Sequence, residues 1–228
     1  MKKKLFISVI FIAICTLLVG CDDRNDGVIV GGWKLDTSAK QTKIPSKALE
    51  AFNKAISGYK EDKYEVVALL GTQVVSGTNY MFFCKKVAKD GGKTYGTVVV
   101  YRDLTGRSRV TRKDLFNISD YANKNIKYIK EDSVGGWSIY KNIGLSKLSK
   151  KMQDMFVKAT LNRDGIHYQP IALLGTQLNT KTNYAFLAIK VDITGKTPYT
   201  INVLTISKKK DNVKLKSVAY VDLADFSN

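Results

Sequence analysis

Residues 45–57 carry apolar side chains at the spacing of an amphipathic helix. Apolar residues recur there at intervals of three and four, which places them on one face of an α-helix. Pro45 suits the first turn of such a helix, and Gly58 suits its end. The positions expected to face the core are Ala48, Leu49, Phe52, Ala55, Ile56 and Tyr59.

The pattern after residue 60 is typical of β-strands. Four segments are rich in β-branched and aromatic residues, and turn-forming residues separate them, including Asp90-Gly91-Gly92, which strongly favours a hairpin. The segments are YEVVALLGTQVV, TNYMFFCKKVA, KTYGTVVVYRDL and RVTRKDLFNI. They predict an antiparallel meander of about four strands. One helix laid across such a sheet buries one of its faces, so the fold class is α+β.

The whole succession occurs twice, at an offset of 104 residues. VGGW, ALLGTQ and TNY start at residues 30, 68 and 78, and again at residues 134, 172 and 182. Between Val30 and Lys86, 21 of 57 positions are identical to the second copy, which indicates a duplicated unit of domain size. The second helix carries its apolar stripe at Leu148, Met152, Met155, Phe156 and Ala159.

The expected architecture is two tandem units, each with one helix packed on an antiparallel sheet of about four to five strands. We assign unit 1 to residues 30–122, a polar linker to residues 123–133 and unit 2 to residues 134–228. The segments DLFNIS and DLADFS, which start at residues 114 and 222, match at an offset of 108. One hairpin of unit 2 is therefore expected to be about four residues longer than its counterpart.

The N-terminus has the pattern of an export signal. Lys2–Lys4 precede an apolar run, Leu5–Gly20, that is too short to span a membrane comfortably. The run ends at Cys21, and the segment resembles the lipobox of bacterial lipoproteins, in which the cysteine is lipidated and becomes the first mature residue. The alternative is an ordinary secretory signal with a chance cysteine. The resemblance implies a signal peptide at 1–20, a tether at 21–29 and a lipid anchor in the bacterial cell envelope, with the choice of membrane left open.

The charge balance favours anionic partners in general. The net charge is +17, and removal of residues 1–20 takes away three lysines and no acids, which leaves +14. The lysines are scattered along the chain, and export removes the usual nucleic-acid targets, so we expect no nucleic-acid partner. The expected partner of this charge is the anionic membrane surface. We expect the protein to be a monomer.

Candidate catalytic and metal-binding residues are few. Cys84 is the one cysteine that remains after Cys15 leaves with the signal and Cys21 takes the lipid, so no intramolecular disulfide is expected. Ala188 occupies the position of Cys84 in the second copy, which favours a packed side chain over a reactive thiol. His167 is the single histidine, and no cluster of acids, bases, nucleophiles or metal ligands is evident. We therefore expect no enzyme activity, no cofactor and no metal.

One hairpin motif connects the chain to a known family. Residues 73–77 read Gln-Val-Val-Ser-Gly, residues 78–80 continue with Thr-Asn-Tyr, and Gly31 and Gly32 precede the helix. This arrangement resembles the cystatin family of inhibitors of papain-like cysteine proteases, and it is most similar to the single-domain stefins. The resemblance covers about residues 29–119. It implies a cystatin fold and a papain-like cysteine protease as the partner.

The resemblance also implies three protease-binding segments. They are an apolar trunk that ends at Gly31 or Gly32, a first hairpin with Gln73, Val74, Val75, Ser76 and Gly77, and a second hairpin with Leu104, Thr105 and Gly106. Thr105 stands where stefins have a proline, and the Pro-Trp pair of secreted cystatins is absent. The second hairpin therefore departs from the family pattern.

A tight apolar hairpin suits such a role on physical grounds. Val74 and Val75 offer apolar area to a narrow cleft with little rotamer entropy to lose, and Gly77 can adopt φ > 0 without a side chain that clashes. The tip of unit 2, residues 178–181, is Leu-Asn-Thr-Lys, and its amide and charge oppose insertion into a tight cleft. Inhibition through unit 1 is the expected function, and a non-inhibitory binding or structural lipoprotein is the alternative.

Overall fold

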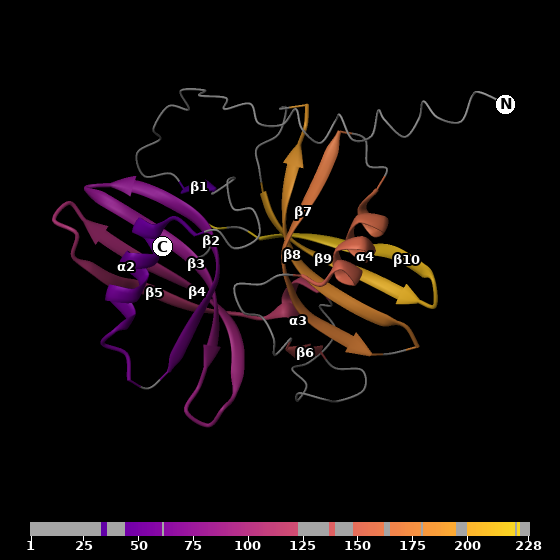
Figure 1. Cartoon of the computed structure of the whole chain (residues 1–228), viewed down its shortest axis with the longest axis horizontal. Helices are drawn as coiled ribbons and strands as arrows, with labels where there is room; N and C mark the ends of the chain where they lie inside the picture. Colours follow the sequence, from indigo (N-terminus) through magenta and orange to yellow (C-terminus); the bar gives the residue numbers. More distant parts are fainter. Residues whose placement is uncertain are drawn as a thin grey trace.

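The computed structural model describes residues 33–35, 44–60, 62–122, 137–139, 148–161, 165–178, 180–194, 200–221 and 223. These residues form two antiparallel five-stranded sheets, and one long helix packs on each (Figure 1). In both sheets the strands lie side by side in their order along the chain. The expected α+β class and tandem arrangement are confirmed, with five strands in each unit.

Unit 1 begins with a short strand, followed by the helix and a four-stranded meander, and ends in a short helix. The elements are β1 (Trp33–Leu35), α2 (Ser46–Ile56), β2 (Lys63–Val75), β3 (Gly77–Val87), β4 (Lys93–Asp103), β5 (Ser108–Phe116) and α3 (Ile118–Ala122). The linker expected at 123–133 lies outside the described residues.

Unit 2 repeats this order. Its elements are β6 (Trp137–Ile139), α4 (Lys150–Thr160), β7 (Ile166–Leu178), β8 (Thr182–Asp192), β9 (Thr200–Lys209) and β10 (Asn212–Val221). The register also repeats, because Trp33 pairs with Gln73 on β2 and Trp137 pairs with Gln177 on β7. The duplication seen in the sequence is therefore a duplication of the hydrogen-bonded ladder.

The length difference between the units is smaller than expected, and it is divided between two turns. Seven residues separate Lys86 from its partner Thr94, and nine separate Lys190 from its partner Thr200, so the β8–β9 turn is two residues longer. The following turn of unit 2 is shorter by one residue, because Lys208 pairs with Val213 where Arg102 pairs with Ser108. The expected four-residue extension of one hairpin is therefore wrong, because the similarity of DLFNIS and DLADFS near the chain end does not follow the strand register.

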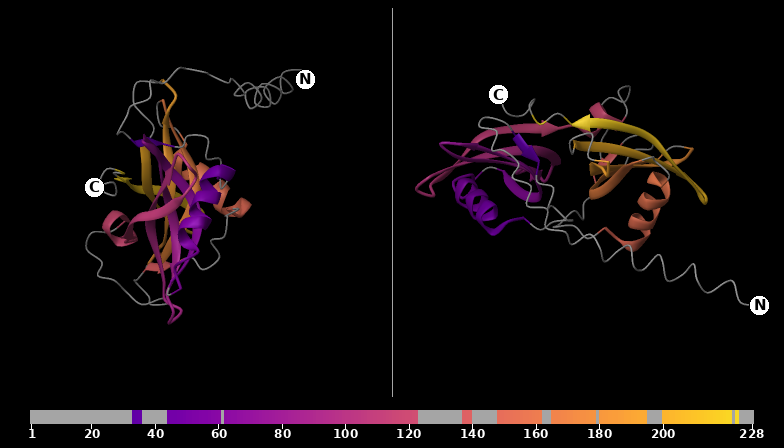
Figure 2. Two further views of the ribbon diagram at one scale, coloured as in Figure 1. Left: turned by 90° about the vertical axis from the view of Figure 1, so that its left-hand side faces the viewer. Right: turned by 90° about the horizontal axis from the view of Figure 1, so that it is seen from above.

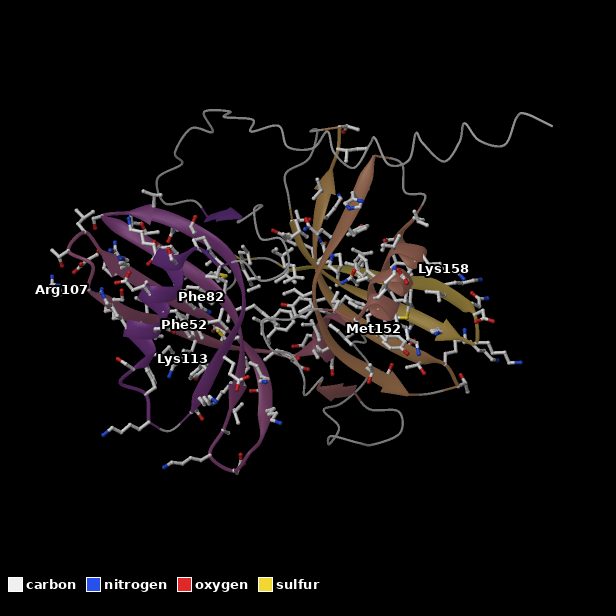
Figure 3. All side chains as sticks on the ribbon, viewed as in Figure 1. Phe52, Phe82, Arg107, Lys113, Met152 and Lys158 are labelled. Atoms are coloured by element: carbon white, nitrogen blue, oxygen red, sulfur yellow. The ribbon has the colours of Figure 1, made fainter. Side chains whose placement is uncertain are left out.

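Each helix packs through most of the stripe that its sequence predicts, but Tyr59, which was expected to face the core, follows the end of α2 and is exposed. In α2 the side chains of Ala48, Phe52 and Ala55 are buried, and Ala51 joins them. The ring of Phe52 lies 4.9 Å from that of Phe82 on β3 (Figure 3). The second helix, α4, repeats this contact between Phe156 and Phe186 at 5.2 Å. These edge-to-face pairs join each helix to the middle of its sheet.

The sheet faces that turn away from the helices form one apolar cluster shared by both units. Equivalent positions of the two sheets supply it, in the pairs Val67 and Ile171, Leu70 and Leu174, Phe83 and Leu187, and Tyr95 and Ile201. Figure 2 (right) shows the two sheets meeting in the middle of the molecule, with α2 and α4 to either side of the junction. The short helix α3 of unit 1 packs against β9 and β10, and Tyr121 stacks on Phe116 at 4.6 Å.

This shared cluster corrects the picture of two sheets that each bury one face. The central strands are buried on both faces, with a helix on one side and the other unit on the opposite side. Lys85 is buried on the unit 1 side of the cluster, where it pairs with Glu65, and Ile189 takes the equivalent position in unit 2. The two units are therefore one packed body.

Candidate functional site

The two candidate hairpins of unit 1 lie at the same end of its sheet, where neighbouring strands turn. The β2–β3 hairpin turns at Ser76, with Val75 paired to Gly77. Gly77 in turn pairs with Asp103, the last residue of β4, so the turn after Asp103 lies directly beside the first hairpin. We call residues 73–77 and 103–107 together the unit 1 edge. The fold thus brings together residues that are about thirty positions apart.

The first strand of the sheet, β1, also begins at this end. Trp33 pairs with Gln73, and Leu35 pairs with Gly71, so β1 runs away from the edge. Gly31 and Gly32, the predicted end of the trunk, lie outside the described residues, as does Cys21. The register places Trp33, which directly follows the two glycines, beside the first hairpin.

Apolar side chains project from both hairpins. Val74 is 45% exposed and Leu104 is 85% exposed, although both are apolar. Val75 is half-buried, and Ser76 is exposed at the tip. An exposed apolar residue on each of two neighbouring turns gives the unit 1 edge a surface that a partner could cover.

Position 77 requires glycine for a steric reason as well as a conformational one. Its φ is +144°, and a Cβ at this position would lie 2.5 Å from the carbonyl oxygen of Arg102 and 2.9 Å from the ring of Tyr101. The Tyr101 hydroxyl donates a hydrogen bond of 2.7 Å to the carbonyl oxygen of Ser76. The tip of the first hairpin is thereby held against β4, and only glycine fits the space.

One carboxylate organises the second turn. The Asp103 carboxylate accepts hydrogen bonds from the backbone N–H and hydroxyl of Thr105, at 2.9 and 2.7 Å, and from the backbone N–H and Nε of Arg107, at 2.9 and 2.7 Å. These donors hold the pKa of the Asp103 carboxyl well below its usual value, the Thr105 side chain contributing most. Thr105 therefore ties the turn by hydrogen bonds at the position where stefins have a proline.

Gln73 has a structural partner. The Asn79 Nδ2 donates a hydrogen bond of 2.7 Å to Gln73 Oε1 across the ladder. In unit 2 the Asn183 Nδ2 donates to Gln177 Oε1 at 2.8 Å, and both of these residues are buried. The same pair in both units explains why GTQ and TNY are kept on either side of a rewritten tip. Our sequence reasoning missed this role, although the recurrence of both residues was its signal.

Unit 2 presents a different edge. Thr180 and Lys181 are exposed beside the turn between β9 and β10, and Asn179 lies outside the described residues. Lys209 pairs with Asn212 across that turn, and Lys210 lies within it at φ +53°. Lysines thus stand where unit 1 has Gly77 and the Asp103 turn.

Side chains of the types that often catalyse reactions or bind metals are buried or lie apart from one another in the described residues. Cys84 is a free, fully buried thiol, and burial raises its pKa, so it is not a reactive nucleophile. Within the described residues, no three His, Cys, Asp or Glu side chains gather as metal ligands would. No helix in that part of the chain is long and apolar enough to cross a membrane. The exposed apolar side chains at the unit 1 edge are suited to binding a partner.

Two kinds of comparison with known proteins found no match. Neither the scan against protein-family models nor the search of curated proteins gives a match.

Proposed function

We propose that the protein is an inhibitor of papain-like cysteine proteases with a cystatin-like unit 1, and that the unit 1 edge blocks the protease cleft. The observation that carries this proposal is the joint placement of Val74 and Leu104, two exposed apolar side chains on rigid neighbouring turns. The strand at which the N-terminal segment enters the sheet pairs with Gln73 at the same edge. An edge of this kind offers three adjacent contacts to one cleft.

Rigidity supports the proposal energetically. The first hairpin is held by the Tyr101 hydroxyl and the second turn by the Asp103 carboxylate, so neither needs to be ordered on binding. Each side chain that is already ordered saves about 0.5–1.5 kcal/mol of association free energy. A pre-ordered edge that fills a cleft without a correctly placed scissile bond would inhibit rather than be cleaved.

The alternative function is a non-inhibitory binding or structural lipoprotein of the cell envelope. The hydrogen bond between Asn79 and Gln73 favours it, because its counterpart in unit 2 shows that this glutamine has a role independent of any protease. The same fold can carry different functions, so the edge itself must be tested.

The anchoring part of the proposal concerns Cys21. Lipid on this cysteine would hold the protein at a membrane of a bacterial cell envelope after export. A chain with Cys21→Ser should leave the membrane fraction or accumulate as an uncleaved precursor. Normal maturation and membrane retention of that variant would contradict the anchor.

Inhibition is tested with residues 22–228 and a papain-like protease in a fluorogenic assay. We expect tight inhibition, and we expect Val74→Asp to raise the inhibition constant about a hundredfold, because a charge at a buried contact must be desolvated. The matched control is Thr180→Asp at the tip of unit 2, which should leave the constant unchanged. A folded protein that inhibits no papain-like protease would favour the binding lipoprotein instead.

A further inference from the structure

The edge of unit 2 that corresponds to the unit 1 edge is a dense group of lysines. Lys181 lies at the tip of the β7–β8 hairpin, and its neighbour Thr182 pairs with Lys208, so it stands beside the next turn. Lys209 ends β9 and Lys210 lies in the turn that follows, and both are exposed. Lys158 on α4 reaches the turn as well, since its Nζ donates a 3.0 Å hydrogen bond to the backbone oxygen of Asp211. We call these five lysines the lysine edge.

Among the described residues, no acid neutralises most of the charge of the lysine edge. Lys181, Lys208, Lys209 and Lys210 form no ion pair with any residue that the structure describes. Asp211 is the one acid in the turn. The unit 1 edge is different, because there Arg107 is paired with Asp103 at 2.7 Å. Two copies of one scaffold thus differ in free positive charge at the same place.

The conformation of Lys210 adds to this contrast. It is the one described residue other than glycine with a positive φ, at +53°. Glycine or asparagine takes this left-handed conformation with less strain. A lysine that occupies such a site against local preference indicates that the charge at the turn matters more than ease of turning.

We propose that the lysine edge binds the anionic phospholipid headgroups of a membrane. Residues 178–182 and 207–214 contain no aromatic side chain on which a nucleic-acid base could stack and no arginine for bidentate phosphate contacts. Exposed lysines on flexible stems instead match the diffuse negative charge of a lipid surface. The proposal rests on the lipid anchor proposed above for its biological setting, because an anchored chain has a headgroup layer within reach.

The two attachments would act on different units of the molecule. Figures 1 and 3 place the unit 1 turn that contains Arg107 at one end of the long axis and the β9–β10 turn, in yellow, toward the other end. Cys21 precedes Trp33, at the unit 1 edge, by twelve residues, a reach of roughly 40 Å when extended. A lipid tether joined to unit 1 and lysines at the far end of unit 2 would favour an orientation with the long axis along the membrane surface.

The test uses residues 22–228, which carry no lipid, and vesicles of phosphatidylcholine with or without phosphatidylglycerol. We expect cosedimentation with the anionic vesicles alone and a loss of binding as salt rises. Each lysine contributes about fivefold to the partition coefficient, so the triple variant Lys181→Gln, Lys209→Gln and Lys210→Gln should bind about a hundredfold more weakly. Thermal unfolding of the variant should match that of the parent chain.

The matched control removes three exposed lysines of unit 1, by Lys47→Gln, Lys60→Gln and Lys89→Gln. It has the same net charge as the test variant and should lose much less affinity. Equal losses in both variants would overturn the proposal, because net charge alone would then explain binding. Indifference to phosphatidylglycerol, or tighter binding to a single-stranded oligonucleotide at the same salt, would also overturn it. None of these readouts depends on lipidation or on a protease.

Discussion

At the scale of single residues, Gly77 and Lys181 show how one position separates the two units. They are equivalent positions on equivalent hairpins, but Gly77 is the first residue of β3, whereas Lys181 directly precedes β8. In unit 1 the close approach of Arg102 and Tyr101 leaves no room for a side chain. The valine-bearing tip is consequently drawn against β4.

Gly77→Ala should destabilise the protein by about 1–3 kcal/mol, because the new Cβ would clash with the Arg102 carbonyl and the backbone would be strained. It should also weaken inhibition by displacing Val74 and Val75. Chemical denaturation and the protease assay measure the two effects.

Gly58→Ala is the control for this substitution, since a Cβ there meets no atom within 4 Å and the backbone conformation is ordinary. It should change the free energy of unfolding little. If both variants were equally stable, the proposed role of the glycine in holding the tip would be wrong.

At the scale of elements, the turn between β4 and β5 depends on one carboxylate. Asp103 joins the two ends of the turn, because it accepts hydrogen bonds from Thr105 and Arg107, while its backbone N–H donates to the carbonyl oxygen of Arg107 at 3.0 Å. Leu104 is exposed because the backbone around it is held in this shape. The shape of the turn therefore determines how Leu104 is presented to solvent.

The low pKa of Asp103 sets the pH range in which this turn is held. A carboxyl whose pKa is depressed in the folded state contributes fully above its unfolded pKa, and its contribution is lost as the pH falls through the folded value. The turn should therefore keep its shape throughout the neutral range and loosen only in strong acid.

Asp103→Asn removes the charge and should mobilise the turn at neutral pH. We expect faster hydrogen exchange at the Thr105 and Arg107 amides and an inhibition constant raised about tenfold, consistent with the loss of charged hydrogen bonds. Asp90→Asn is the control, because Asp90 accepts from Gly92 in a turn at the other end of the sheet. Unchanged exchange at Thr105 in Asp103→Asn would contradict this account.

At the scale of the whole molecule, the two units share a core. The faces of both sheets that turn away from the helices contribute equivalent side chains to one cluster, so neither unit can be removed without exposing its partner. A pairing of equivalent surfaces is the arrangement found in symmetric dimers, here joined in one chain. Unit 2 therefore supports unit 1 by packing, whatever else it binds.

This packing predicts that the units unfold together. Leu187→Ala in unit 2 should lower the free energy of unfolding by about 2–5 kcal/mol. The fluorescence of the two tryptophans reports on the units separately. A Trp137→Phe chain reports on unit 1 through Trp33, and a Trp33→Phe chain reports on unit 2 through Trp137. Leu187→Ala should shift the unfolding transition equally in both chains. Leu115→Ala, at an exposed side chain, is the control and should shift neither. A shift confined to the unit 2 probe would show that the units are independent.

Much of the fold follows from local pattern. The helix stripe through Phe52, the turns at Gly77 and Asp90-Gly91-Gly92, and the repeat at offset 104 were all evident in the sequence, and the structure confirms the elements that they predict. Hairpins and amphipathic helices depend on neighbours within a few residues, which is why their pattern is visible in the chain. The nearness of the two candidate hairpins is also a consequence of the meander, because every second hairpin turns at the same end of the sheet.

The tertiary structure alone decided which residues meet across longer distances. Runs such as VVALL and FLAI are typical of strands buried on both faces. The sequence analysis nevertheless expected a single buried face for each sheet, because composition does not reveal whether a second helix or a second sheet covers the other face. The Asn79 and Gln73 pair, the close approach of Arg102 to Gly77, and the turn held by Asp103 each need a register that is set by the whole ladder. The sequence by itself thus determined the repeated elements, because these obey local periodicity. Only the folded chain decided that the two sheets share a core and that one edge is apolar while the other is cationic, because these features depend on which surfaces the completed fold leaves exposed.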